Sequence, residues 1–135
     1  MCAVAEMHGG FAALRGERTM NVGVRAIAAP ASPALIRDVA RLAELWAEGL
    51  ERFGGPWLAG GEFTAVDAFF APVAFRVRTY AIEVGVAGAG WVETILSHPA
   101  MQVWERAALS EEWREQEHEA VLARCGQVTA DYRAR

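Results

Sequence analysis

Lysine is absent from this chain of 135 residues, and all 13 basic residues are arginine. The 17 acidic residues give a formal net charge of −4 at pH 7. A nucleic-acid-binding domain usually carries a basic surface, and no cluster of arginines along this sequence offsets the acidic balance. We therefore expect no nucleic-acid partner.

Cysteine and long apolar runs are scarce as well. Two cysteines, Cys2 and Cys125, lie near opposite ends of the chain, and this number favours a reduced, cytoplasmic protein over a disulfide framework. No run of 18 apolar residues occurs, so the sequence predicts no membrane span. The N-terminal segment lacks a basic region and includes Glu6, which is not the pattern of a signal peptide.

Serine is also rare, which limits the candidate nucleophiles. Ser32, Ser97 and Ser110 are the three serines of the chain. Each precedes a predicted helix, so we interpret all three as N-caps rather than as nucleophiles. No Gly-x-Ser-x-Gly turn or P-loop occurs. The sequence therefore predicts no catalytic residue of these types.

One histidine lies among carboxylates in the acidic stretch near the C-terminus. Glu115, His118 and Glu119 have the spacing to share one helix face. Because the segment is strongly acidic, we favour a solvated surface over a metal site. We expect no bound metal.

Composition and patterning predict one all-α domain. The chain is 53% hydrophobic and 22% charged, and its length suits a single core. No segment alternates with period two, so strands are not expected. We predict a bundle of five to six helices over residues 1–135. It begins inside its first helix, and the tail after about residue 125 is expected to be poorly ordered.

Start and stop signals separate the predicted helices. Residues 21–34 are expected to form a loop. The helices are predicted from the start to about Leu14 or Met20, from Ser32-Pro33 to Gly54-Gly55, from Thr64 to about Tyr80, around Trp91 to Leu96, from Ser97-His98-Pro99 onward, and from Ser110 to near Gly126.

A capping box opens the most apolar of these helices. In Thr64-Ala-Val-Asp67 the Asp67 carboxylate can accept from the backbone N–H of Thr64. A helix that is apolar on nearly all sides is a central, buried one, so the role of Asp67 is interpreted as structural rather than catalytic. Pro72 is predicted to kink this helix. Arg76 is expected to pair with Glu6 or with a carbonyl that Pro72 frees.

Several short motifs share their order with those of one family. They are Pro56-Trp57-Leu58-Ala59-Gly60, Phe63 to Asp67, Glu6 to Arg15, Ala71-Pro72-Val73 with Arg76 and Tyr80, and Ser97 to Met101 with Trp104. This order, over roughly residues 1 to 120, resembles the C-terminal helical domain of the glutathione transferase superfamily, especially its bacterial members.

The resemblance implies a site on the first helix. In the family this helix borders the cleft that faces a thioredoxin-like domain, so Met7, His8, Phe11 and Arg15 would contribute to the pocket for an electrophile. Arg15 would meet an anionic substrate group or a carboxylate of glutathione. The residues themselves also allow a second interpretation, with Met7 and Phe11 as core and Arg15 as a surface ion pair.

The same resemblance implies a division of labour between two domains. The thioredoxin-like domain supplies the catalytic residue and most glutathione contacts, and no sequence of that kind occurs here. We therefore expect this chain to be the half of such a transferase that carries the electrophile site, and not to be catalytic alone. We expect no cofactor, and glutathione would bind only when a thioredoxin-like domain is supplied.

Two alternatives remain for the function. One is a free-standing binding or dimerisation module, and the other is a small isomerase or lyase with its own pocket. The expected partners are a second copy, packed through the first two predicted helices around Phe11 and Trp46, or a thioredoxin-like domain. A hydrophobic electrophilic small molecule is the expected ligand.

Overall fold

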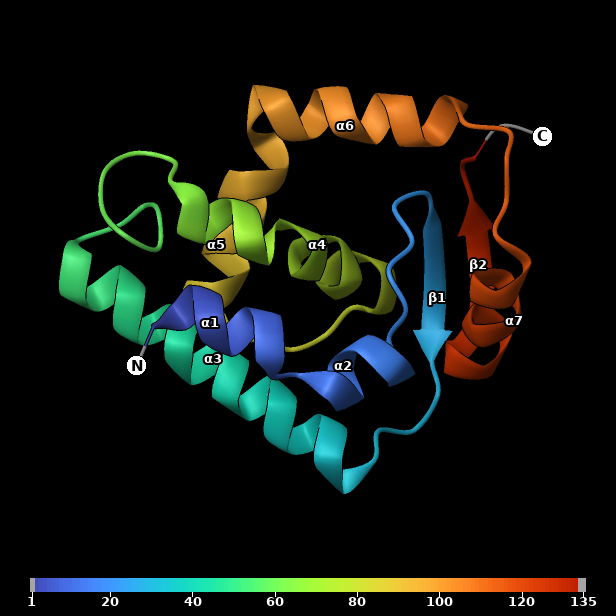
Figure 1. Ribbon diagram of the computed structural model, residues 1–135, viewed down its shortest axis with the longest axis horizontal. Helices are drawn as coiled ribbons and strands as arrows, with labels where there is room; N and C mark the ends of the chain where they lie inside the picture. The colour runs from blue at the N-terminus through green and yellow to red at the C-terminus, as the bar shows by residue number, and fades with distance from the viewer. Residues whose placement is uncertain (1, 134–135) are drawn as a thin grey trace.

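The computed structural model describes residues 2–133 and shows a mainly helical domain with a small sheet (Figure 1). The helices are α1 (Ala3–Gly9), α2 (Ala12–Glu17), α3 (Pro33–Phe53), α4 (Ala65–Tyr80), α5 (Gly85–Ser97), α6 (Pro99–Ser110) and α7 (Gln116–Cys125), and the strands are β1 (Val24–Ala28) and β2 (Gly126–Asp131). The helical bundle is confirmed. The prediction of five to six helices without strands is wrong, because residues 2–133 hold seven helices and two strands.

Helix α4 lies at the centre of the domain (Figure 1) and contacts α1, α5 and β1. Its side chains Phe70, Val73 and Phe75 are fully buried. Trp46 of α3 and Trp91 of α5 complete the main core, with ring centroids 4.4 Å apart. The central, buried position predicted for this helix is confirmed.

The ends of α3 follow from local chemistry. The hydroxyl of Ser32 accepts from the N–H of Leu35 at 3.1 Å, and Pro33 occupies the first turn. Gly54 ends the helix with φ +78°, a left-handed conformation that glycine adopts without strain. Both predicted boundaries are confirmed.

The first predicted helix is broken in two. Gly10 leaves the helix, and Phe11 takes a left-handed backbone conformation with φ 55° between α1 and α2. Two successive glycines make this interruption possible because they weaken the helix. The expected single helix to Leu14 or Met20 is therefore wrong. An ion pair of 2.6 Å between Glu6 and Arg41 attaches α1 to α3.

Two segments that are expected to form a loop and a tail pair as a sheet instead. β1 and β2 pair antiparallel, and the pairing brings Ala28 opposite Gly126. Val24 is fully buried in a second cluster with Tyr80, Leu122 and Cys125. A Cβ at residue 126 would clash with the carbonyl oxygen of Ile27, so this close approach needs glycine. The prediction of a poorly ordered tail does not hold for residues 126–131.

Two of the three serines do not cap a helix. Ser97 donates to the carbonyl of Glu93, and His98 caps α6 instead, its Nδ1 accepting from the N–H of Ala100 at 3.3 Å. Ser110 is the last residue of α6. Helix α7 begins later, after Glu115, whose carboxylate accepts from two backbone N–H groups of the first turn.

The two side chains expected at a dimer interface lie inside the core. Phe11 is 5% exposed and Trp46 is not exposed at all. They are therefore not available to a second copy, and substitution of either would disturb the core of a single chain. Dimerisation through other surfaces stays a prediction.

Candidate functional site

The four predicted pocket residues lie where α1 gives way to α2. Met7 and Phe11 are buried in the main core, whereas His8 is exposed. Arg15 is half-buried on α2 and its Nη1 donates to the carbonyl oxygens of Met7 (3.1 Å) and His8 (3.4 Å). The fold thus brings His8 and Arg15 together at the surface, with Met7 and Phe11 beneath them.

Arg15 stands near a second arginine that also lacks a carboxylate partner. Arg76 of α4 donates from Nε to the carbonyl of Arg18 at 2.8 Å and from Nη1 to that of Pro72 at 3.3 Å. Neither Arg15 nor Arg76 takes part in an ion pair within residues 2–133. We call these two side chains the arginine pair.

The electrostatics of the arginine pair favour an anion. Burial lowers the pKa of Arg76 to about 10, and the positive charge of Arg15 contributes to the same shift. The two guanidinium groups repel each other across a partly desolvated site. An anionic group between them would relieve that repulsion and could accept from the guanidinium forks.

The placement of Arg76 follows from how α4 holds the segment before β1. Arg76 donates to the carbonyl of Arg18, the Thr79 hydroxyl to that of Asn21 at 2.6 Å, and Arg78 to that of Val22 at 3.2 Å. Arg78 also pairs with Glu105 at 2.6 Å. The polar residues on an otherwise apolar helix therefore anchor residues 18–22. The partner of Arg76 is not Glu6, as one expectation had it, but backbone carbonyls.

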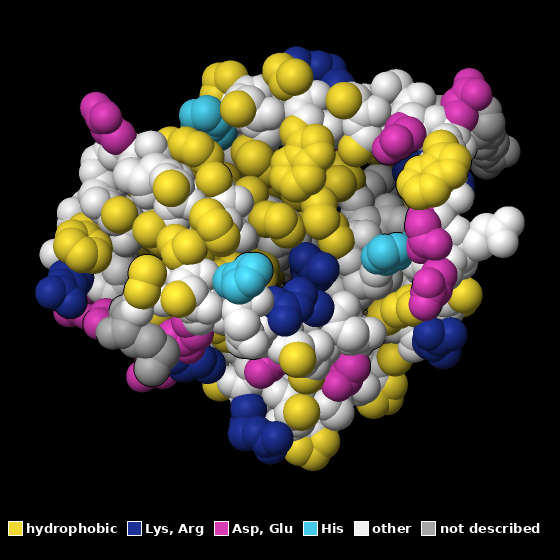
Figure 2. Space-filling view, in the orientation of Figure 1, with side chains coloured by type: hydrophobic (Ala, Val, Ile, Leu, Met, Phe, Trp, Pro, Cys, Tyr) yellow, Lys and Arg dark blue, Asp and Glu magenta, His cyan; other side chains and the backbone are white. Residues whose placement is uncertain are grey.

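One face of the molecule shows charged and apolar groups side by side. Figure 2 shows arginine side chains and a histidine together near the middle of the face on which α1 and α2 lie. Hydrophobic side chains gather above them, towards α6 (Figure 2). Exposed apolar side chains on α4 and α6 include Phe69 (45%) and Trp104 (40%). Such a surface suits an apolar molecule with an anionic group, or a covering domain.

The capping box is formed, and Asp67 does more than cap α4. Its Oδ2 accepts from the N–H (2.9 Å) and the hydroxyl (3.0 Å) of Thr64, as predicted for a box. Its Oδ1 accepts from the N–H of Leu58 and from the indole N–H of Trp91, each at 2.9 Å. Asp67 is fully buried, and its two carboxylate oxygens accept four hydrogen bonds from Leu58, Thr64 and Trp91. The structural interpretation of this carboxylate therefore agrees with its surroundings.

The remaining candidate groups do not assemble into a site. Glu115 pairs with His118 at 2.6 Å on an exposed surface, while Glu119 binds Arg133. Within residues 2–133 no three histidine, cysteine, aspartate or glutamate side chains are arranged to hold a metal ion. None of the described helices combines the length and hydropathy needed to cross a bilayer.

Comparison with known families adds the identity of the fold. Residues 29–123 match the family described as glutathione S-transferase, C-terminal domain. The chain belongs to this family. No curated protein and no solved structure gives a significant match. The match begins directly after β1, covers α3 to α6 fully and ends within α7. Helices α1 and α2 precede it, so the site residues on them rest on the resemblance of Glu6 to Arg15 alone.

Sequence reasoning missed the arginine pair and the Trp91 partner of Asp67. Arg15 and Arg76 are 61 positions apart in a sequence that gives no sign of their proximity. The one available signal was chemical: an arginine on an apolar helix needs acceptors. That signal identified Arg76 as unusual without identifying its neighbour.

Proposed function

We propose that this chain is the electrophile-binding half of a glutathione transferase-like protein. The observation that carries the proposal is the arginine pair, placed beside exposed apolar surface in a glutathione transferase C-terminal domain. The substrate class is an apolar electrophile with an anionic group. Arg15 and Arg76 orient it by charge, and the neighbouring apolar side chains take up its body.

In this proposal the chemical step needs a second domain. Transferase chemistry is attack of a thiolate on an electrophilic carbon, and the thiolate must be stabilised by a nearby donor. The phenol of Tyr80 interacts electrostatically with Arg76, but its hydroxyl is buried in the core and does not reach a thiolate at the surface. We propose that a thioredoxin-like domain, in a reducing cytoplasm, covers the face that carries the arginine pair. That domain supplies the donor that stabilises the thiolate.

A non-reactive ligand tests the binding role. We would titrate ¹⁵N-labelled protein with 2,4-dinitrobenzoate, an aromatic nitro compound that carries a carboxylate, and with neutral 1,3-dinitrobenzene. We expect the benzoate to shift the amide signals of His8 and Arg15. Arg15→Gln should weaken its binding by about tenfold, since a hydrogen bond to a charged group contributes that much.

Arg37→Gln is the matched control for this titration. Arg37 is exposed on α3 and makes no ion pair among the described residues. It changes the net charge by the same amount and should leave the dissociation constant unchanged. Equal binding of the neutral and anionic compounds, or an equal loss in both variants, would contradict the proposed role of Arg15.

A further inference from the structure

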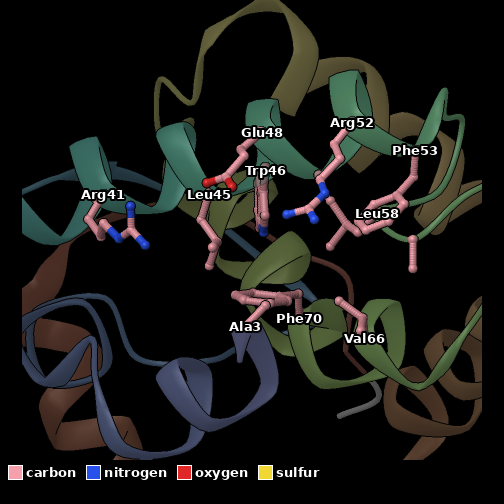
Figure 3. Close-up of a pocket in the computed structure, with 12 residues that line it drawn as sticks. Ala3, Arg41, Leu45, Trp46, Glu48, Arg52, Phe53, Leu58, Val66 and Phe70 are labelled. Atoms are coloured by element: carbon pink, nitrogen blue, oxygen red, sulfur yellow. The ribbon is translucent and has the colours of Figure 1, made fainter. Parts of the chain in front are cut away.

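A cavity of about 340 Å³ opens between α3, the loop that follows it and the start of α4. It contains none of the four predicted pocket residues and neither member of the arginine pair. Its volume lies in the range of small-molecule sites. The apolar part of its wall is formed by Leu45, Phe53, Leu58, Ala59, Val66 and Phe70 (Figure 3).

One cation of this cavity has no carboxylate partner. Arg41, at one end, is held by Glu6 at 2.6 Å and by Glu44 at 2.8 Å. Arg52 lies over the ring of Phe53 at 5.5 Å and takes part in no ion pair within residues 2–133. Figure 3 shows its guanidinium reaching into the cavity.

A buried donor without a partner lies beside Arg52. Trp46 is fully buried, and its Nε1 has no hydrogen-bond acceptor among the described residues. In Figure 3 this nitrogen points into the cavity, on the same side as the guanidinium of Arg52. A buried donor left unpaired costs free energy, and an acceptor on a ligand would recover it.

Trp91 and Asp67 hold the part of the cavity wall that carries Trp46 in place. Trp91 packs against Trp46 with ring centroids 4.4 Å apart and ring planes at 48°, and its indole N–H donates to Asp67. The same carboxylate oxygen accepts from the N–H of Leu58, which also lines the cavity. A rigid carboxylate therefore fixes two parts of the lining, which makes the cavity a preformed site.

We infer that this cavity binds a small apolar molecule with a terminal carboxylate. The guanidinium fork of Arg52 takes the carboxylate, as arginine does in bidentate pairs. The buried N–H of Trp46 supplies a further donor. The alkyl or aryl body of the ligand lies against Leu45, Val66 and Phe70.

Decanoate is a suitable probe, with decanol as the neutral molecule of equal chain length. We would follow the indole N–H signal of Trp46 by NMR and measure both dissociation constants by calorimetry. Decanoate should bind saturably, shift the Trp46 signal and bind about tenfold more tightly than decanol, because only the anion pairs with Arg52.

Arg52→Gln separates the anion claim from simple apolar binding. Arg52 is exposed, so the variant should fold. Arg52→Gln should lower the affinity for decanoate to that for decanol. The controls Arg37→Gln, on the same helix, and Arg15→Gln, in the arginine pair, should leave the affinity for decanoate unchanged. Equal affinity for both probes, an unaffected Arg52→Gln variant, absence of saturation, or signal shifts confined to other residues would each overturn the inference.

Discussion

The indole N–H of Trp91 donates to Oδ1 of Asp67 over 2.9 Å, although the two residues are 24 positions apart. This bond joins the N-terminus of α4 to the middle of α5. Since Oδ1 also accepts from Leu58 and Oδ2 binds Thr64 twice, one carboxylate organises the loop before α4, the cap of α4 and the core.

Removal of this carboxylate should be costly. In Asp67→Ala the buried donors of Leu58 and Trp91 lose their acceptor, and the cap is lost as well. We expect the free energy of unfolding to fall by about 3 kcal/mol or more, since each unsatisfied buried donor costs about 1–3 kcal/mol. Urea denaturation followed by circular dichroism measures it.

Glu62→Ala is the control for that experiment. It removes an exposed carboxylate from the same loop, and surface substitutions usually change stability by less than about 0.5 kcal/mol. If Asp67→Ala were as stable as Glu62→Ala, the buried network would not contribute as described.

Local signals in the sequence predicted the features that depend on a few neighbouring residues. The Ser32 cap, the Gly54 stop and the Thr64–Asp67 box each need only a short segment, and the structure confirms them. The start of the last helix is predicted at Ser110 because Glu111 and Glu112 resemble an acidic first turn, whereas α7 begins after Glu115.

Features that depend on tertiary placement were not predictable in this way. The strand at Val24–Ala28 is stabilised by pairing with residues about 100 positions later, and neither strand shows an alternation that stands out in the sequence. The arginine pair likewise combines side chains of α2 and α4. The cavity beside Arg52 combines side chains of α1, α3, α4 and the loop that follows α3. Only the packing of α1 to α5 brings them together.

The close approach of α3 to the following loop gives a second stability prediction. A Cβ on Gly49 would lie 2.7 Å from the backbone oxygen of Leu58, so Gly49→Ala forces a backbone shift. We expect a loss of about 1–3 kcal/mol in the free energy of unfolding despite the better helix propensity of alanine. Thermal and urea denaturation should agree on the direction.

Gly90→Ala, in α5, is the matched substitution. A Cβ at Gly90 meets no atom within 4 Å. This variant should gain about 0.5–1 kcal/mol, because alanine replaces an exposed helical glycine. Stabilisation in both variants would show that α3 and the loop are not in close contact at Gly49.

The ion pair between Glu6 and Arg41 predicts a pH dependence. The hydrogen bond and charge of Arg41 lower the pKa of Glu6 below its ordinary value of 4.5. A lowered folded-state pKa stabilises the protein above the unfolded-state pKa, and that stabilisation is lost as pH falls through the folded-state value. The stability difference between wild type and Glu6→Gln should therefore be full at about pH 6 to 7, well above the ordinary pKa of glutamate. It should shrink as the pH falls through that ordinary pKa and then through the lower folded-state pKa.

Glu51→Gln provides the comparison for the pH series. Glu51 is exposed on α3 and has no ion pair among the described residues. Its difference from wild type should stay small and constant with pH. A pH-independent difference for Glu6→Gln would show that Glu6 and Arg41 are not paired in solution.

The most direct test of the proposed function is a calorimetric titration of this chain with glutathione, followed by a conjugation assay with a chloronitrobenzene. In the proposal the arginine pair holds an anionic group, but the Tyr80 hydroxyl that interacts with Arg76 is buried and does not reach a thiolate at the surface. We predict no saturable glutathione binding up to about millimolar concentration and no turnover by this chain alone. A millimolar dissociation constant corresponds to a binding free energy of only about 4 kcal/mol. A glutathione dissociation constant in the micromolar range, or conjugation at a rate above the uncatalysed reaction, would contradict the proposal.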